Sequence, residues 1–312
     1  MILALAGGVG GAKLADGLAR SLDPRELVIA VNTGDDFEHL GLRVSPDLDT
    51  VMYTLAGIAN PVTGWGQAGE SWAFMEALER LGGPGWFRLG DRDLATHVER
   101  TQRLGRGESL SQVTRGLCER LGVRQALVPM SDDPVPTRVR TEAGWLDFQH
   151  YFVREQCRPA LGAIEYQGAE SARPSAELRA ALDSLELEGV VICPSNPYLS
   201  VAPILALPGV SHALQACRTV VAVSPIVGGE AIKGPAAKIM RELGAEPTAL
   251  GIARYYARLV DILVIDRADA ALVPEIEALG LRAVACDTIM RDAEGRARLA
   301  RECISLVRGT RS

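Results

Sequence analysis

The chain has 312 residues, of which 47% are hydrophobic and 23% charged, proportions that indicate a globular protein with a large core. Its net charge of −6 and pI near 5.4 argue against a general nucleic-acid or membrane-surface binder. The six cysteines are scattered without a C-x-x-C pair, and the sequence contains no apolar run long enough to span a bilayer. We therefore expect a cytoplasmic protein with reduced, mostly buried cysteines and no zinc site.

Seven short apolar runs predict strands. They are continuously apolar rather than alternating, which is typical of strands buried on both faces of a parallel sheet. In chain order the runs are 2–6, 27–31, 125–129, 190–193, 219–223, 262–265 and 282–286. Helical patterns lie at 12–21, 48–59, 175–185, 235–243 and 273–279. This alternation predicts an α/β fold with a doubly wound, mainly parallel, Rossmann-like sheet.

Two segments interrupt the alternation. Residues 70–122 read as mostly helical, with a helix start at Ser109, and residues 137–152 read as a β-hairpin that turns at 142–144. We interpret the chain as one domain over residues 1–312, with a core of 1–69, 123–136 and 174–312. The insertions, about 70–122 and 137–173, are expected to cover the strand ends.

A glycine-rich segment, residues 7–13, follows the first predicted strand. Glycine lets a backbone approach a phosphate closely, and the N-terminus of the next helix attracts anions. We take Gly8, Gly10 and Gly11 as candidate phosphate contacts, although neither G-x-G-x-x-G nor the Walker A pattern is complete. A tight turn without a ligand is the alternative. Lys13 is either a phosphate ligand or a surface lysine.

The segment from 35 to 49 holds five carboxylates just after the second predicted strand. Carboxylates crowded at the end of a buried strand need a metal, a basic side chain or a proton between them. Asp35, Asp36, Asp47 and Asp49 could therefore bind Mg²⁺, orient a hydroxyl or act as a base. For Asp47, a helix N-cap is the alternative. Asn32 immediately precedes this stretch.

Four further polar segments are candidates. Arg88 and Arg92 could bind an anion, or could simply lie at a solvated helix start. Residues 129–134, 193–197 (with Ser195 and Asn196) and 224–229 (with Ser224 and Gly228) each follow a predicted strand, so they should meet at the carboxyl edge of the sheet. His39 and His97 lie near these segments, but a lone histidine is more often structural.

Seven motifs together make the chain recognisable. In order they are GGVGGAK, NTGDD, SPDLDT, LGDRD, PMSDDPV, PSNP and VSPI. The sequence resembles the CofD family, the 2-phospho-L-lactate transferases of deazaflavin coenzyme biosynthesis, from its first strand to about Met290.

The resemblance implies an enzyme of coenzyme F-420 biosynthesis that requires Mg²⁺. Such an enzyme transfers a 2-phospho-L-lactyl, phosphoenolpyruvyl or 3-phosphoglyceryl group from a guanosine diphosphate-linked donor. The acceptor is the ribityl hydroxyl of 7,8-didemethyl-8-hydroxy-5-deazariboflavin (Fo), and GMP is released. The resemblance places Asp49 and Arg88 at the deazaflavin. It places the glycine segment, Ser195, Asn196 and residues 224–229 around the guanosine diphosphate.

We assign catalytic and Mg²⁺-binding roles to Asp35, Asp36 and Asp49. The predicted binding residues are Gly8, Gly10, Gly11, Lys13, Asn32, Arg88, Arg92, Ser195, Asn196, Ser224 and Gly228. The predicted partners are the two small-molecule substrates and a second copy of the chain in a homodimer, with neither nucleic acid nor membrane.

The YvcK-like gluconeogenesis factors, which bind nucleotide-sugars in a regulatory role, are the alternative. They share the glycine segment but continue Asp-Asp-Gly-Gly-Ser-Ser-Gly. Here Phe37-Glu38-His39 follows Asp36, which favours the transferase. A Rossmann dehydrogenase ranks third because the dinucleotide fingerprint is incomplete.

Overall fold

The computed structural model describes residues 1–232 and 234–309. Seven strands form one sheet in the order β14-β13-β10-β9-β1-β2-β5, and every pairing between neighbours is parallel. The strands are β1 (Ile2–Ala6), β2 (Leu27–Val31), β5 (Ala126–Pro129), β9 (Gly189–Ile192), β10 (Val220–Val223), β13 (Ile262–Asp266) and β14 (Arg282–Cys286). Each lies within one residue of its predicted bounds, so the predicted fold class is confirmed.

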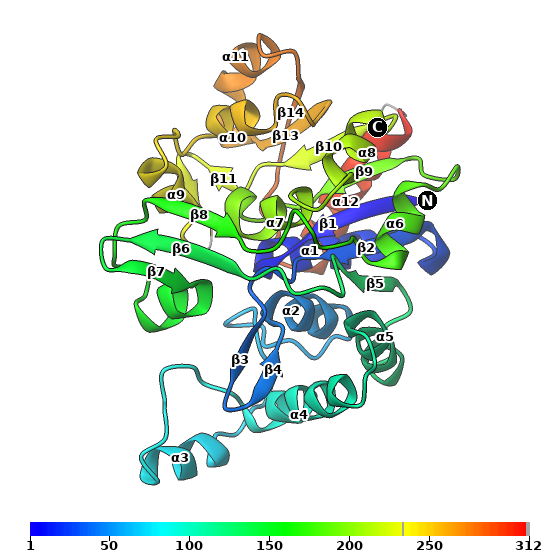
Figure 1. Ribbon diagram of the computed structural model, residues 1–312. Coiled ribbons are helices and arrows are strands. Elements are labelled where there is room, and N and C mark those ends of the chain that lie inside the picture. Colours follow the sequence, from blue (N-terminus) through cyan, green and yellow to red (C-terminus); the bar gives the residue numbers. More distant parts are fainter. Residues whose placement is uncertain (233, 310–312) are drawn as a thin grey trace.

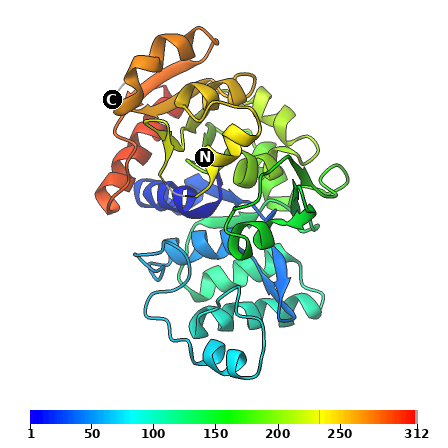
Figure 2. The same cartoon turned by 90° about the vertical axis from the view of Figure 1, so that its left-hand side faces the viewer.

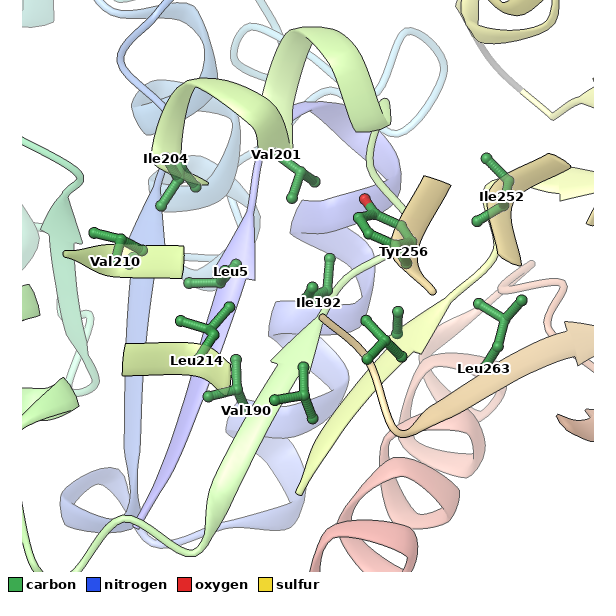
Figure 3. Close-up of a cluster of buried hydrophobic side chains, with 14 of the residues drawn as sticks. Leu5, Val190, Ile192, Val201, Ile204, Val210, Leu214, Ile252, Tyr256 and Leu263 are labelled. Carbon is green, nitrogen blue, oxygen red and sulfur yellow. The ribbon is translucent and has the colours of Figure 1, made fainter. Parts of the chain in front are cut away.

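Two hydrophobic cores lie on opposite faces of the sheet, because alternate side chains of each strand point to opposite sides. One face packs against α1 (Gly8–Ser21), α2 (Pro46–Leu55), α5 (Leu110–Arg120) and α12 (Ala293–Arg308). The other packs against α6 (Ala176–Leu182), α7 (Ala202–Leu205), α8 (Val210–Ala216), α9 (Ala236–Glu242), α10 (Ala249–Tyr256) and α11 (Val273–Glu277). Figure 3 shows Leu5, Val190 and Ile192 of the strands facing Ile204 and Leu214 in this second core.

The first insertion extends away from one side of the sheet, and its last helix packs on the sheet face. It contains α3 (Ala73–Arg80), α4 (Asp91–Gly105) and α5, beside the hairpin of β3 (Phe37–His39) and β4 (Leu42–Val44) (Figures 1 and 2). Helix α5 starts as predicted. The Ser109 side chain accepts from the Gln112 N–H, and the Gln112 side chain accepts from the Ser109 N–H.

The second insertion is a three-stranded antiparallel sheet. β6 (Thr137–Thr141) pairs with β7 (Gly144–Asp147), which confirms the predicted hairpin, and also with β8 (Ala163–Tyr166), which the sequence pattern did not predict. A π-helix (His150–Arg154) follows β7. This sheet lies on the left in Figure 1.

The predicted helix bounds were wrong in two places that matter for the site. Helix α1 begins at Gly8 rather than residue 12, so the glycine segment is its first turn. Helix α2 ends at Leu55, ahead of Gly57, which has a left-handed φ of +72°. Helices α7, α8, α10 and α12 and the β3–β4 hairpin were missed. In α12, four of the seven buried residues are small (Gly295, Ala297, Ala300 and Cys303), which weakens the apolar pattern along the sequence.

The strand order reverses between β1 and β9. From β1 the chain continues to β2 and β5 on one side, whereas β9, β10, β13 and β14 extend the sheet on the other side. Such a switch point opens a crevice outside the carboxyl ends of the strands, and ligands of open α/β sheets bind there. The site should therefore lie beyond Ala6 and Ile192.

The six cysteines are free thiols, four buried and two half-buried, as predicted. Within residues 1–232 and 234–309, no single helix is long and apolar enough to cross a membrane. One pair, Pro197–Leu205 with Val210–Ala216, meets that test only when taken together, with a bend of 88° between its two parts.

Helix α1 packs closely on α12 at Gly17. A Cβ at this position would overlap the backbone carbonyl oxygen of Arg296 and lie 3.1 Å from the Ala300 Cβ. Asp16, which precedes it, accepts from Arg296 Nη1 at 3.0 Å and Arg20 Nε at 2.9 Å. The close approach at Gly17 therefore positions α12 against the sheet.

We predict that Gly17→Ala lowers the free energy of unfolding by about 1–3 kcal/mol, because a backbone oxygen cannot move aside as a side chain can. Gly105→Ala, at the end of α4, is the matched control: nothing lies within 4 Å of its added Cβ. The control should gain up to about 1 kcal/mol from helix propensity. Urea unfolding measures both, and equal stabilities would contradict the packing argument.

Candidate active site

A cavity of about 660 Å³ lies at the switch point. Its walls are formed by residues that follow β1, β2, β9, β10 and β14, and by Phe87, Arg88, Phe148, Gln149 and Phe152 of the two insertions. The insertions therefore cover the strand ends, as predicted. The lining includes the first turn of α1, several carboxylates and several aromatic side chains.

The glycines allow α1 to approach the segment after β9. A Cβ on Gly10 would overlap the carbonyl oxygen of Pro194, and one on Gly11 would lie 2.6 Å from Ser195 Oγ. Ser195 Oγ in turn accepts from the Gly7 N–H at 3.2 Å and donates to the Gly7 carbonyl at 2.8 Å. The glycine motif therefore brings the two central strand ends together, whether or not a phosphate binds beside them.

Asp47 contacts the N-terminus of α1. Its Oδ1 accepts from the Gly8 N–H at 2.7 Å, and Gly8 itself has a left-handed φ of +63°. The N-cap of α2 is Ser45, and Asp47 is the second residue of that helix. The alternative that Asp47 caps its own helix is therefore wrong. It instead binds the first N–H of the neighbouring helix.

Asp47 and Asp35 share one amide. Asn32 Nδ2 lies 2.9 Å from Asp35 Oδ1 and 3.0 Å from Asp47 Oδ2, and Gln149 Nε2 lies 3.5 Å from Asp35 Oδ2. Burial raises the pKa of Asp47 to about 6. Burial, with repulsion from Asp47 and Asp36, raises the pKa of Asp35 well above its usual range. These hydrogen-bond donors are neutral, so full ionisation of the pair calls for a cation.

Asp49 lies in a different environment. Arg100 of α4 contacts both of its oxygens, with Nη1 3.0 Å from Oδ2 and Nη2 paired with Oδ1. His97 Nδ1 lies 3.2 Å from Arg100 Nη1. Asp93 accepts from the Tyr53 hydroxyl at 2.7 Å and lies 3.4 Å from His97 Nε2. The acidic stretch is therefore divided between an ion-paired carboxylate and a pair held by neutral donors.

The charges of the Asp49 cluster follow from these contacts. Burial disfavours the charge of Arg100, but Asp49 outweighs it and keeps the pKa of Arg100 above its usual value. Burial likewise opposes ionisation of Asp93, yet hydrogen bonds from His97 and Tyr53 leave the pKa of Asp93 lowered. Asp49, Asp93 and His97 offer ligand atoms within 4.8 Å of one another. Arg100, however, already balances the charge of Asp49.

Most predicted site residues line the cavity. They are Gly8, Gly10, Lys13, Asp35, Asp49, Arg88, Ser195, Asn196 and Ser224. Lys13 Nζ also donates to the Met290 carbonyl at 3.1 Å, which ties α1 to the segment after β14. The Arg88 guanidinium lies 4.3 Å from the centre of the Trp72 ring.

The other predicted residues lie behind or away from the walls. They are Gly11, Asn32, Asp36, Arg92 and Gly228. Asp36 Oδ2 accepts from Ser45 Oγ at 2.7 Å, the Arg92 guanidinium donates to the Ala68 carbonyl at 3.0 Å, and the Gly228 N–H donates to Asp269 at 3.0 Å. Arg92 thus holds the loop before α3, and Asn32 acts through Asp35 and Asp47.

The acidic turn at 129–134 is structural rather than part of the crevice. Asp132 accepts from the Ser111 N–H at 2.7 Å in the first turn of α5, and Asp133 accepts from the Arg173 N–H at 2.9 Å. Neither carboxylate lines the cavity, so the expected convergence of this segment on the site was wrong.

Sequence reasoning missed Tyr53, Asp93, Arg100 and Gln149 and gave His97 no role. The sequence did contain a signal for Asp93, His97 and Arg100, because spacings of four and three residues place them on one face of a helix. No comparable pattern marks Gln149, which enters the site from the second insertion.

The fold and site define an α/β protein with a ligand crevice at the strand switch point, bordered by a helix N-terminus and carboxylates. A family model described as 2-phospho-L-lactate transferase CofD matches residues 2–304. The chain therefore belongs to the CofD family, as the sequence motifs predicted.

Curated relatives match over nearly their whole length. A phosphoenolpyruvate transferase of Streptomyces griseus is 42% identical over 100% of this chain and 99% of its own. A 2-phospho-L-lactate transferase of Methanopyrus kandleri is 41% identical, covering 97% and 96%. A solved structure of a UPF0052 family protein from Bacillus halodurans has a TM-score of 0.62 at 14% identity, over 97% of this chain and 98% of its own. That likeness supports the fold alone.

We predict that Asn32→Ala lowers the free energy of unfolding by about 1–3 kcal/mol near pH 8, because two buried carboxylates lose their shared donor. The loss should be smaller near pH 5, where Asp47, with a pKa of about 6, carries a proton. Urea unfolding at both pH values measures this. Asn60→Ala is the control, because Asn60 accepts from Val62 N in an exposed turn. A loss for Asn32→Ala that does not change with pH would contradict the shared-charge model.

Proposed function

We propose that the protein transfers a phospho-acid group from a guanosine diphosphate-linked donor to the ribityl hydroxyl of Fo, releasing GMP, in coenzyme F-420 biosynthesis. The observation that carries the proposal is the cavity of about 660 Å³ at the switch point, whose lining combines a helix N-terminus and carboxylates with aromatic side chains. Membership of the CofD family and relatives named for two such transfers support it.

The wall around the first turn of α1 suits the diphosphate of the donor. Gly8 and Gly10 of this turn line the cavity, as do Lys13 and Asn196. A helix N-terminus and a lysine both favour negative charge. The aromatic lining residues Phe87, Phe148, Phe152 and the half-exposed Trp65 suit a flat conjugated ring.

In the transfer step, the acceptor hydroxyl oxygen forms a bond to the phosphorus that carries the phospho-acid. The bond from this phosphorus to the GMP oxygen breaks, GMP leaves, and the hydroxyl proton passes to a carboxylate. Such reactions depend on positioning and charge neutralisation. We assign proton acceptance to one carboxylate of the Asp35–Asp47 pair, because a raised pKa suits a base, and leave the other to a cation. Asp49, held by Arg100, orients the acceptor hydroxyls, and Asp36 lies behind the wall, where it accepts from Ser45 Oγ.

We further propose Mg²⁺ as the cofactor. The test of fit is the donor set: Asp35 and Asp47 offer carboxylate oxygens, the ligands Mg²⁺ prefers, without a basic partner among their hydrogen bonds. Asp36 Oδ1 is buried without a hydrogen-bond partner. Of the predicted trio, Asp35 fits best, whereas Asp49 is already paired. When bound, Mg²⁺ would offset the negative charge of the diphosphate.

The alternative is a regulatory nucleotide-sugar binder of the YvcK type. The test is incubation with Fo, Mg²⁺ and guanylated donors of all three phospho-acids in competition, followed by mass spectrometry. We expect one dominant phospho-acid ester of Fo and an equal amount of GMP. Saturable donor binding without GMP release would favour the regulatory alternative. The choice of phospho-acid is left to this experiment, because relatives of almost equal identity bear different names.

Cytoplasmic location fits a reaction between small polar molecules. The expected homodimer stays a prediction, which light scattering of the purified chain tests.

We predict that Mg²⁺ raises the melting temperature more near pH 8 than near pH 5. The pKa of Asp47 is raised from 3.8 to about 6, so the folded state binds this proton more tightly than the unfolded state. Its contribution to stability is greatest below pH 3.8 and is lost as the pH rises through about 6. Mg²⁺ replaces the proton only where the pair is ionised.

Thermal unfolding with and without Mg²⁺ measures this effect, with NaCl at matched ionic strength as the control for screening. Asp47→Asn should remove most of the difference between the two pH values. Equal shifts at both pH values, or a shift that NaCl reproduces, would contradict a Mg²⁺ site at this pair.

A further inference from the structure

Arg100 is the largest side chain among those described that are almost fully buried, at 1% exposed. It belongs to α4 of the first insertion, whereas its partner Asp49 belongs to α2 of the core. Asp49 lines the cavity and Arg100 does not. Arg100 therefore acts on the site through the cavity-lining side chains that it contacts, and Asp49 is the one that it holds at both oxygens.

A buried ion pair of this kind is weak evidence for stability. Taking both charges out of water costs about as much as their attraction returns, and apolar replacements of similar volume are often neutral or stabilising. The pair is, however, well suited to hold a carboxylate in one orientation. The planar guanidinium contacts both oxygens of Asp49, a geometry that a lysine cannot reproduce.

Arg100 is itself held by its neighbours. Its Nη1 lies 3.2 Å from His97 Nδ1 and 3.4 Å from the Arg43 carbonyl of β4. His97 is in turn flanked by Asp93, which accepts from the Tyr53 hydroxyl. Besides Asp49, the guanidinium thus contacts a side chain of its own helix and the backbone of β4.

The surroundings are otherwise negative. Asp36 and Asp49 both interact with the charge of Arg100, and Asp93 lies on the far side of His97. Without Arg100, the Asp49 carboxylate would be buried among like charges. It would then lose the two-point contact that fixes its orientation.

We propose that Arg100 is a positioning residue for the transfer reaction, which fixes the orientation of the Asp49 carboxylate in the cavity wall that receives the acceptor hydroxyls. This inference rests on the proposed function and adds a residue outside the cavity to it. It also gives the first insertion a role, because the placement of α4 sets the placement of Asp49.

The test is a double-mutant cycle of Asp49→Asn, Arg100→Gln and the double variant in the full chain. Transfer is measured with Fo and the donor that the wild-type protein prefers. Each single change should lower kcat/KM for Fo at least tenfold while changing KM for the donor less than twofold. The kcat/KM of the double variant should be no lower than that of the less active single variant, because Arg100 affects the reaction through Asp49.

Arg103→Gln is the matched control. Arg103 lies on the same helix and pairs with Glu108 outside the cavity, so its loss should leave kcat/KM unchanged. Arg100→Lys keeps the charge but loses the two-point contact, and we expect a loss of tenfold or more. If Arg100→Gln does not fold, two other variants are measured in its place. They are Arg100→Lys and the double variant Asp49→Asn/Arg100→Met, in which both charges are removed.

The inference would be overturned if the activity losses of the two single variants multiply in the double variant. It would also be overturned if Arg100→Lys folds and keeps an unchanged kcat/KM for Fo. Fo fluorescence titration distinguishes this failure from failure of the proposed function. If the wild-type protein makes no product with any donor, the proposed function fails. Weaker Fo binding by Arg100→Lys than by Arg103→Gln would still support the positioning role, and equal binding would refute it.

Discussion

The site depends on how a protein buries several carboxylates at the ends of parallel strands. Repulsion between such groups is strong away from water. Here Arg100 balances Asp49 directly, whereas Asp35 and Asp47 share the Asn32 amide and keep an unbalanced charge. The first arrangement gives a fixed carboxylate. The second gives a pair held by neutral donors, in which burial raises the pKa of both carboxyl groups.

This electrostatic division follows the architecture. The carboxylates belong to the core, but the arginine that balances Asp49 comes from α4 of the first insertion. The amide that reaches Asp35, from Gln149, comes from the second insertion. The insertions therefore complete the site as well as cover it. The core without the insertions would bring the acidic residues together but would lack the side chains of Arg100 and Gln149 that contact them.

Close packing at the switch point is the second constraint. Gly10 and Gly11 let α1 approach Pro194 and Ser195 without a side chain between them, which brings the ends of β1 and β9 into one wall. The sequence analysis interpreted the glycine motif as a phosphate-binding segment. Close packing of α1 against the segment after β9 requires these glycines even without a ligand. Both readings lead to the same location, because the gap between these two strands is where the crevice opens.

The strands, the parallel sheet and the family could be predicted from sequence, because continuous apolar runs and seven ordered motifs are local signals. The acidic stretch was likewise predicted to be functional from residues close together in the chain. Only the tertiary structure decided which partner each carboxylate has. Asp47 meets Gly8 across 39 residues and Asp49 meets Arg100 across 51. Charge balance acts through space, so a pattern along the chain identifies the groups but not their neighbours.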